Sequence, residues 1–445
     1  MDNLARSKAG VELRQTALAV LLVSASACIF DEGGQWLVDG GGSPVDGAIN
    51  PYGDGSVGIP ADAAVDSPID ADPTAIIEDV AHVPDQATYA GTADIVLNMP
   101  GISIDTEMLT VSAPIWPTNG SVVFEVTDQE DASGSELAVL HVGSLEITPG
   151  GKVTVTGSRP LVILARGPVT IDGLLEASAN LTSPGPGGEI SDAGQGNGGL
   201  GTESDFRTGG GGGAGFHTAG AQGGSGDYGD VTAAGGAGGV MYGDPDMTLL
   251  QGGSGGGTGG RSAVSMCDLG KGGAGGGAVQ IYSATSITIS GWINVGGGGG
   301  TGGGGFIDCV SSTAGGGGGS GGAIYLQSPQ VTTTNMSTLA ANGGGGGSGG
   351  GNGMYGGGHG HDGQDGQPSM TPAMGGGATT YGSCGGTGGI LYLQPTPGDT
   401  IDDKTNGGGG GGSVGHIVVS THPDGSSLAS TISPPANPIT YLDRL

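Results

Sequence analysis

Aromatic residues, basic residues and long apolar runs are all scarce in this chain, and each shortage excludes something. Phe, Trp and Tyr make up 4% of the 445 residues, so a conventional globular core would be thin. Only 11 Lys and Arg stand against 42 Asp and Glu, for a net charge of −31. Nothing therefore neutralises phosphates, which argues against nucleic acids and anionic lipid surfaces as partners.

Glycine is what the chain has in excess, with 106 residues. Collagen is excluded, because the glycines keep no strict Gly-x-y register and the 24 prolines are too few. Complete disorder is also disfavoured, because Val, Ile and Leu are clustered along the chain rather than diluted through it.

The first 28 residues have the features of an export signal. Arg6, Lys8 and Arg14 precede the apolar stretch "TALAVLLVSASA", which is too short to span a bilayer and stops at Cys28. "ASAC" is similar to a bacterial lipobox, although Ala25 stands where Leu is usual; ordinary cleavage after "ASA" is the alternative. We expect a signal peptide over 1–28, lipidation of Cys28, and an exported protein anchored by lipid at the outer membrane or cell surface.

An acidic segment follows the signal. From Asp31 to Asp85 there are 12 Asp and Glu and no Lys or Arg, spaced by Ala, Pro and Gly. So little apolar surface cannot support a folded core, and the like charges repel one another. We expect an extended, disordered tether over 29–86.

A ladder of short strands is predicted over 87–179. Two apolar columns recur every eight residues, and the two members of each pair are two residues apart, as on one face of a strand. The columns are Leu137, Leu145, Val153, Leu161, Val169 and Val139, Ile147, Val155, Ile163, Ile171. Gly and Pro interrupt the pattern between pairs, which excludes helices and indicates an all-β fold.

The same pattern returns later in the chain. Residues 161–177 align without gaps on 279–295, and further copies begin at Ala323, Ile390 and His416. Such repeats are typical of a parallel β-solenoid, in which stacked coils bury a continuous apolar column. The glycine-rich stretches between copies, a long one over 180–277 and others within 278–445, would project from one corner of the solenoid. They would be packed as threefold polyglycine-type helices or be flexible loops.

One segment has a recognisable resemblance. "ELAVLHVGSLEITPGGKVTVTGSRPLVILARGPVTIDGLLEASAN" resembles a module of uncharacterised, glycine-rich secreted lipoproteins of myxobacteria and related lineages, and "GSRPLVILA" is its most specific part. The Asp/Ala/Pro tether, "LLQGGSGGGTGG" and "GGSGGAIYLQ" also resemble those proteins. The resemblance implies this architecture and a cell-surface address, but no activity.

Two groups of residues could carry chemistry. In "MYGGGHGHDGQDGQPSM", His359, His361, Asp362 and Asp365 could bind zinc or copper, and a solvated loop without metal is the alternative. Cys267, Cys309 and Cys384 each precede a predicted coil, so a disulfide between two of them is expected. We expect no other cofactor than such a divalent cation.

Function has to be inferred from architecture, because no active site is evident. The predicted strand faces carry Thr, Ser and Gln rather than the paired carboxylates of carbohydrate-cleaving enzymes. The sequence therefore favours a non-enzymatic, lipid-anchored surface protein with a structural or adhesive role. The alternatives are a β-solenoid that binds or cleaves carbohydrate, with cell-surface or matrix glycans as partners, and a metal-binding surface protein.

Overall fold

The computed structural model describes residues 80–84, 91–113, 120–131, 133–262, 265–305, 311–351, 358–400, 404–436 and 439–441. The chain divides into two units, Met1–Asp72 and Pro73–Leu445, and all described residues belong to the second. The predicted signal peptide, Cys28 and most of the predicted tether therefore lie outside the described residues.

The described residues form an all-β structure of three main sheets and two short ribbons, with no helix. Sheet I contains β1 (Asp94–Leu97), β6 (Ser144–Ile147), β9 (Val169–Ile171), β16 (Ile287–Ile289), β19 (Val331–Thr333) and β22 (Ser426–Leu428). Sheet II contains β23 (Thr431–Ser433), β20 (Thr338–Ala340), β17 (Trp292–Asn294), β10 (Leu174–Glu176), β7 (Lys152–Thr156), β2 (Pro100–Asp105) and β3 (Thr110–Ser112). Sheet III contains β24 (Ile439–Tyr441), β21 (His416–Thr421), β18 (Ala323–Gln327), β15 (Ala278–Ser283), β8 (Leu161–Ala165), β5 (Leu137–Val142) and β4 (Val123–Thr127). The ribbons are β11 (Glu203–Ser204) with β12 (Arg207–Thr208) and β13 (Gly226–Tyr228) with β14 (Val231–Ala233).

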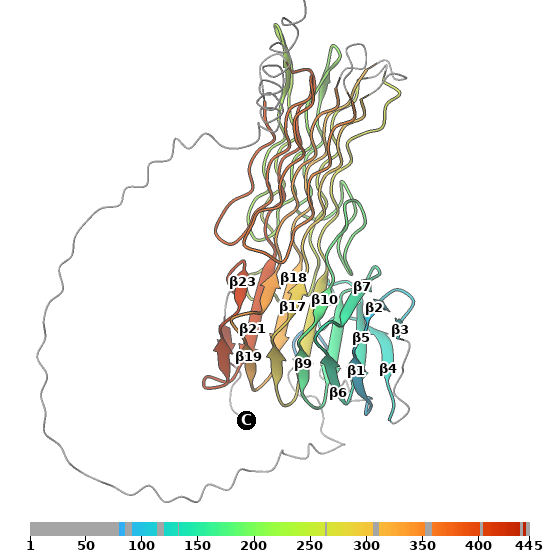
Figure 1. Ribbon diagram of the computed structural model, residues 1–445, viewed down its shortest axis with the longest axis vertical. Coiled ribbons are helices and arrows are strands. Elements are labelled where there is room, and N and C mark those ends of the chain that lie inside the picture. The colour runs from blue at the N-terminus through green and yellow to red at the C-terminus, as the bar shows by residue number, and fades with distance from the viewer. Residues whose placement is uncertain are drawn as a thin grey trace, which may run out of the picture. The chain divides into compact units, whose positions relative to one another are not determined.

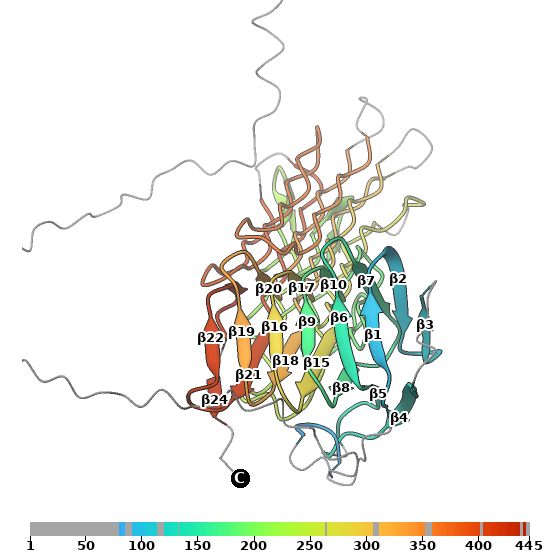
Figure 2. The ribbon, with the colours of Figure 1, turned by 60° about the horizontal axis from the view of Figure 1, so that its bottom comes forward.

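The chain visits the sheets repeatedly in one order, III, I and then II, as in β5–β6–β7, β8–β9–β10 and β15–β16–β17. Equivalent strands of successive passes pair in parallel, and Figure 2 shows those of sheet I side by side. Among the strands of the described residues, antiparallel pairing is confined to β2 with β3 and β4 with β5, at the N-terminal end of the main sheets, and to the two ribbons. Isolated antiparallel bridges also occur in the glycine-rich segments.

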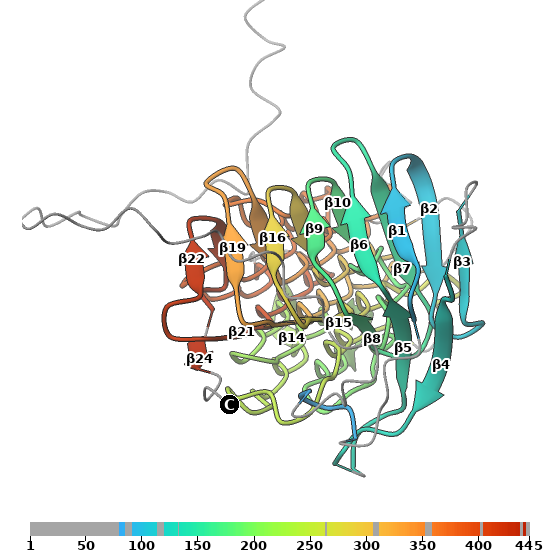
Figure 3. The same ribbon diagram turned by 90° about the horizontal axis from the view of Figure 1, so that it is seen from below.

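The gapless alignment of 161–177 with 279–295 is confirmed by the pairing register. Leu161 pairs with Val279, Val169 with Ile287 and Leu175 with Ile293, each in a different sheet. Alternation decides which side chains face inward: Ile289 is fully buried, whereas its neighbours Thr288 and Ser290 are partly exposed. The sheets thus surround one continuous aliphatic core, and Figure 3 shows sheets I and III as two rows of strands.

The eight-residue columns were assigned wrongly at their start. A step of eight residues along the sequence leads from one strand to the next, and the next strand lies in a different sheet. In β5 the inward residues are Leu140 and Val142, whereas Leu137 and Val139 face the opposite side of sheet III. β5 is buried on both faces, and Leu137 and Val139 are as apolar as Leu140 and Val142, so alternation cannot distinguish inward from outward positions there.

The outer face of sheet III is covered by a second hydrophobic cluster that includes Phe216, Leu250, Val80 and Val83. Val80 and Val83 fall within the tether predicted over 29–86, yet they are 4% and 2% exposed. The predicted boundary is therefore too late, because residues 80–84 pack on the sheet rather than belonging to an extended segment.

Three glycine-rich excursions form a separate lobe, drawn as the extended ribbons above the sheets in Figure 1. Residues 177–277, 295–322 and 341–415 each leave after a strand of sheet II and return at a strand of sheet III, so they project from one corner as predicted. The copy predicted at Ile390 is not a strand of a main sheet, because residues 390–393 form only an isolated bridge within the third excursion.

The lobe is held by backbone hydrogen bonds that repeat every three residues. The N–H groups of Gly315, Gly318 and Gly321 donate to residues 407–413, those of Gly316, Gly319 and Gly322 to 295–301, and those of Gly317 and Ser320 to 254–257. Carbonyls of the same segment accept from 211–214, 273–276 and 344–347. Residues 315–322 therefore bond to six surrounding segments, drawn from all three excursions.

Glycine is required at the centre of the lobe because the backbones touch. A Cβ on Gly211 would lie 1.8 Å from the carbonyl oxygen of Gly257, and one on Gly317 would lie 1.9 Å from that of Gly212. Neither glycine has a positive φ, so the constraint is space rather than conformation. The longest uninterrupted glycine runs are thus the segments with neighbours on every side.

Candidate functional site

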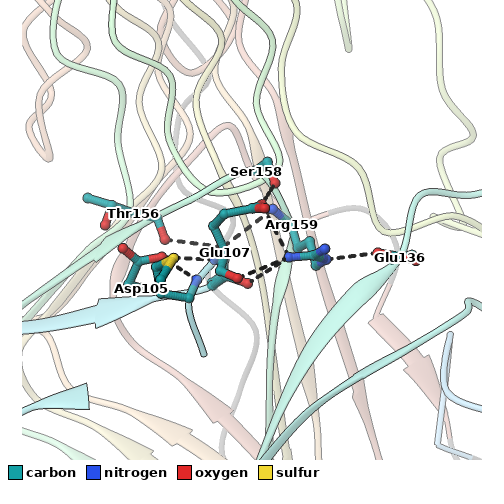
Figure 4. Close-up of polar contacts among 8 residues, drawn as sticks. Asp105, Glu107, Glu136, Thr156, Ser158 and Arg159 are labelled. Carbon is teal, nitrogen blue, oxygen red and sulfur yellow. Dashed lines mark hydrogen bonds and ion pairs between the residues drawn. The ribbon is translucent and has the colours of Figure 1, made fainter. Parts of the chain in front are cut away.

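A cluster of polar side chains surrounds Arg159, in the "GSRP" turn between β7 and β8 (Figure 4). Its Nε donates to Glu136 at 2.9 Å, and Nη1 donates to Glu107 at 3.2 Å and to two backbone carbonyls. The Ser158 hydroxyl also donates to Glu107, and Asp105 accepts from the N–H groups of Glu107 and Met108. These bonds join the β2–β3 turn to the β7–β8 turn.

The cavity between the sheets offers no chemistry. Its lining comes from β1, β2, β3, β5, β6, β7, β8 and β10 and is entirely aliphatic, including Ile95, Leu140 and Ile163. A dry aliphatic space of this kind can neither orient a substrate nor hold an ion.

The predicted metal-binding residues lie on the surface of the lobe. His359, His361 and Asp362 are exposed, and Asp365 is half-buried. The Asp362 carboxylate accepts from the N–H of Gly302, and Asp365 accepts from the N–H groups of Gly299 and Leu181, each at 2.8 Å. Burial raises the pKa of Asp365, and these two N–H donors oppose that shift.

A threefold pattern explains these carboxylates. Gly360, Gly363 and Gly366 face inward and donate to residues 303, 300 and 297, while Asp362 and Asp365 are three residues apart and bond to the adjacent segment. Among the described residues, no group of three or more His, Cys, Asp or Glu is arranged to hold a metal ion. The geometry therefore assigns the two aspartates to the lobe's edge and gives the metal hypothesis no support.

The described cysteines are both in disulfide bonds. Cys267 and Cys384 are 4% and 3% exposed and lie in the first and third excursions. Cys28 and Cys309 lie outside the described residues, so a disulfide between two of Cys267, Cys309 and Cys384 stays a prediction.

Two histidines meet where the lobe joins sheet III, at a site that no sequence pattern indicates. His217, in the first excursion, and His416, at the start of β21, approach to 3.3 Å between their Nδ1 atoms. The Phe216 ring stacks on Tyr242 and meets His416 edge-on, with centroids 4.5 Å and 4.7 Å apart. Burial, reinforced by His217, lowers the pKa of His416 to about 4, and burial also lowers that of His217.

A third histidine fixes the segment at 80–84. His82 is 5% exposed, with Nδ1 2.8 Å from the Gln280 side-chain oxygen and Nε2 2.5 Å from the Met247 carbonyl. Gln280 in turn donates to the Ala81 carbonyl at 2.7 Å. These buried bonds connect three distant parts of the chain and serve packing.

The outer faces of sheets I and II differ in what they present. Sheet I carries a row of hydroxyls, Thr170, Thr288, Thr332 and Ser427, which pair in register. On sheet II, Trp292 is 45% exposed, and its Nε1–H donates to the Met336 carbonyl at 3.4 Å. Trp292 is thus a half-exposed aromatic side chain held on sheet II, next to the buried Asn294 and Thr338.

No protein-family model, curated protein or solved structure matches this chain. The resemblance to myxobacterial lipoproteins accordingly stays a prediction. Within the described residues, no helix is both long enough and apolar enough to cross a membrane.

Proposed function

We propose that this chain is a non-enzymatic, lipid-anchored protein of the cell surface, in which a β-solenoid carries a glycine-rich lobe that contacts other surfaces. The proposal depends on one observation. All three excursions run from a strand of sheet II to a strand of sheet III, and they are joined to one another by backbone hydrogen bonds. Ordering glycine costs more conformational entropy than ordering any other residue. A lobe built at that cost is a dedicated part of the molecule.

The repeated visiting order and in-register pairing support a solenoid. Each pass places one strand in each sheet, and equivalent strands pair from β5 to β8 to β15 to β18 to β21. The antiparallel strands β3 and β4 cover the N-terminal end of sheets II and III, as capping elements do in repeat proteins.

The three-residue hydrogen-bond repeat supports polyglycine-type helices in the lobe. An extended helix with three residues per turn directs successive N–H groups to three different neighbours. The bonds of residues 315–322 follow this pattern, and so do those of 343–351, whose N–H groups alternate between segments 383–389, 313–319 and 358–364.

The far end of the lobe is where we expect contacts with a partner surface. The β11–β12 turn holds Asp205 and Phe206 at φ of 41° and 70°, a conformation that bulky residues rarely adopt. Phe206 is nevertheless 62% exposed. A strained turn that presents an aromatic ring to solvent suggests a role in contact.

Cys28→Ser tests the anchor and the function together. Wild-type cells fed a palmitate analogue should label the protein, keep it on the cell surface and adhere to a solid support; the variant should lose label, retention and adhesion. Equal labelling of both would refute the anchor. Normal labelling with adhesion unaffected by deleting the gene would refute the adhesive role.

A further inference from the structure

Trp292 combines exposure to solvent with a hydrogen bond that fixes its side chain on sheet II. The chain has only 3 Trp, and this one, at the start of β17, is 45% exposed. Its N–H bond to Met336, at the turn before β20, holds the indole toward the neighbouring strand. The indole is held half-exposed on a rigid sheet, so its apolar face is available to a partner.

The strand register places Trp292 in the middle of a row. Lys152, Leu174, Trp292, Thr338 and Thr431 pair successively across β7, β10, β17, β20 and β23. Adjacent strands lie about 4.8 Å apart, so the row extends about 19 Å across the sheet. We call it the Trp292 strip.

The charge of the strip points to an uncharged partner. The chain carries a net charge of −31, yet the row itself holds no acid and one base, Lys152. One carboxylate lies beside the row on β10, that of Glu176, and it accepts a 2.8 Å hydrogen bond from the Asn294 amide. A polyanion would be repelled by the remainder of this acidic chain, whereas a neutral ligand loses nothing.

We propose that the Trp292 strip binds a neutral polysaccharide that lies across the strands. The apolar face of a sugar ring packs on an indole, and its hydroxyls are matched by groups that both donate and accept, such as the Thr431 hydroxyl, which is partly exposed, whereas Thr338 is buried. The strip is long enough for a short run of sugar units. The polysaccharide would be the partner in the proposed contact function. Binding itself does not depend on that function, but its role in the cell does.

Native gels that contain a soluble polysaccharide test the proposal on the full chain. The probes are a neutral β-glucan, a neutral galactomannan and the polyanion alginate. Wild type should be retarded in a neutral gel, and Trp292→Ala should weaken that retardation at least tenfold, with Trp292→Tyr in between. Thr288→Ala, on the hydroxyl row of sheet I, is the matched control and should behave as wild type.

Several outcomes would overturn the proposal. These are retardation in alginate alone, no retardation in any neutral gel, or equal retardation of wild type and Trp292→Ala. Wild-type dimers in sedimentation that Trp292→Ala abolishes would assign the strip to a second copy instead. Trp292→Ala leaves the core intact, and circular dichroism verifies its fold. Because gel binding needs neither Cys28 nor cells, its failure is distinguishable from failure of the anchor or of adhesion.

Discussion

The three-sheet body and the glycine lobe bury their interiors by opposite means. The body encloses aliphatic side chains, such as Ile163, Ile281 and Ile289, all fully buried. The lobe encloses backbone, and central glycines such as Gly317 are buried with their N–H and C=O groups bonded to neighbours. Water is excluded from both, but in the lobe hydrogen bonds replace apolar contacts as the force that selects the packing.

The two interiors tolerate substitution differently for this reason. Burial of an aliphatic side chain contributes roughly 1.5–3 kcal/mol, and a core can often repack around a changed shape. A backbone hydrogen bond contributes only about 0.5–1.5 kcal/mol net, against roughly 1–2 kcal/mol to order each residue. The lobe therefore depends on nearly every bond being made at once.

The largest expected effect is a charge placed in the body. Ile289→Asp would bury a carboxylate without a partner in β16 or force its neutralisation, at a cost of several kcal/mol. That is comparable to the whole stability of a typical domain, about 5–15 kcal/mol. Thr288→Asp, one residue away on the outer face, should be nearly silent. Circular dichroism and protease resistance compare the two; equal tolerance would mean that β16 does not line the core.

Sequence alone was sufficient to predict the strands, and their inward-facing residues, where only one face of a strand is buried. In β9 and β16 the alternation of Val or Ile with Thr showed both the strand and its inward face. In β5 every residue is buried, so Leu137 and Val139 could not be told from Leu140 and Val142. The error arose because a non-local covering, supplied by Phe216 and Leu250, removes the contrast that sequence patterns depend on.

The lobe was predictable in kind but not in arrangement. Glycine runs indicated close backbone packing. The three-residue spacing of Gly360, Gly363 and Gly366 can be read directly from the sequence. That spacing explains Asp362 and Asp365 better than a metal does. Which segments become neighbours depends on contacts between distant residues, such as Gly211 with Gly315, and these leave no local signal.

The next largest effect is expected from a single methyl group inside the lobe. Gly317→Ala places a Cβ 1.9 Å from the Gly212 carbonyl oxygen, so neighbouring segments must separate. Overpacking typically costs about 1–3 kcal/mol, and here it also breaks backbone bonds. Gly377→Ala is the matched control, because its Cβ would meet only a His361 ring atom at 3.9 Å.

Hydrogen exchange separates this outcome from damage to the body. In Gly317→Ala, amides of 209–215, 343–351 and 407–413 should lose protection while those of β8 and β15 keep it. If Gly317→Ala matched Gly377→Ala throughout, the lobe would be a set of independent loops and the contrast between the two interiors would disappear.

The smallest expected effect lies where the two regions meet, at His217 and His416. A histidine whose folded pKa is lowered binds fewer protons when folded than when unfolded, so stability falls as pH drops below the unfolded value of 6.5. The loss continues down to the folded value, about 4 for His416, and is opposed by the attraction of Asp244. Between pH 7 and pH 6 the expected loss is on the order of 1 kcal/mol.

His416→Asn removes the titrating ring and should flatten the pH dependence of thermal unfolding between pH 7 and pH 5. His422→Asn, at a half-buried position beyond β21, serves as the control and should leave the slope unchanged. Exchange of amides near Phe216 and Tyr242 should accelerate on acidification in wild type before that of β8, since the junction titrates and the core does not. An identical slope in wild type and His416→Asn would show that protonation at this junction does not couple the lobe to the body.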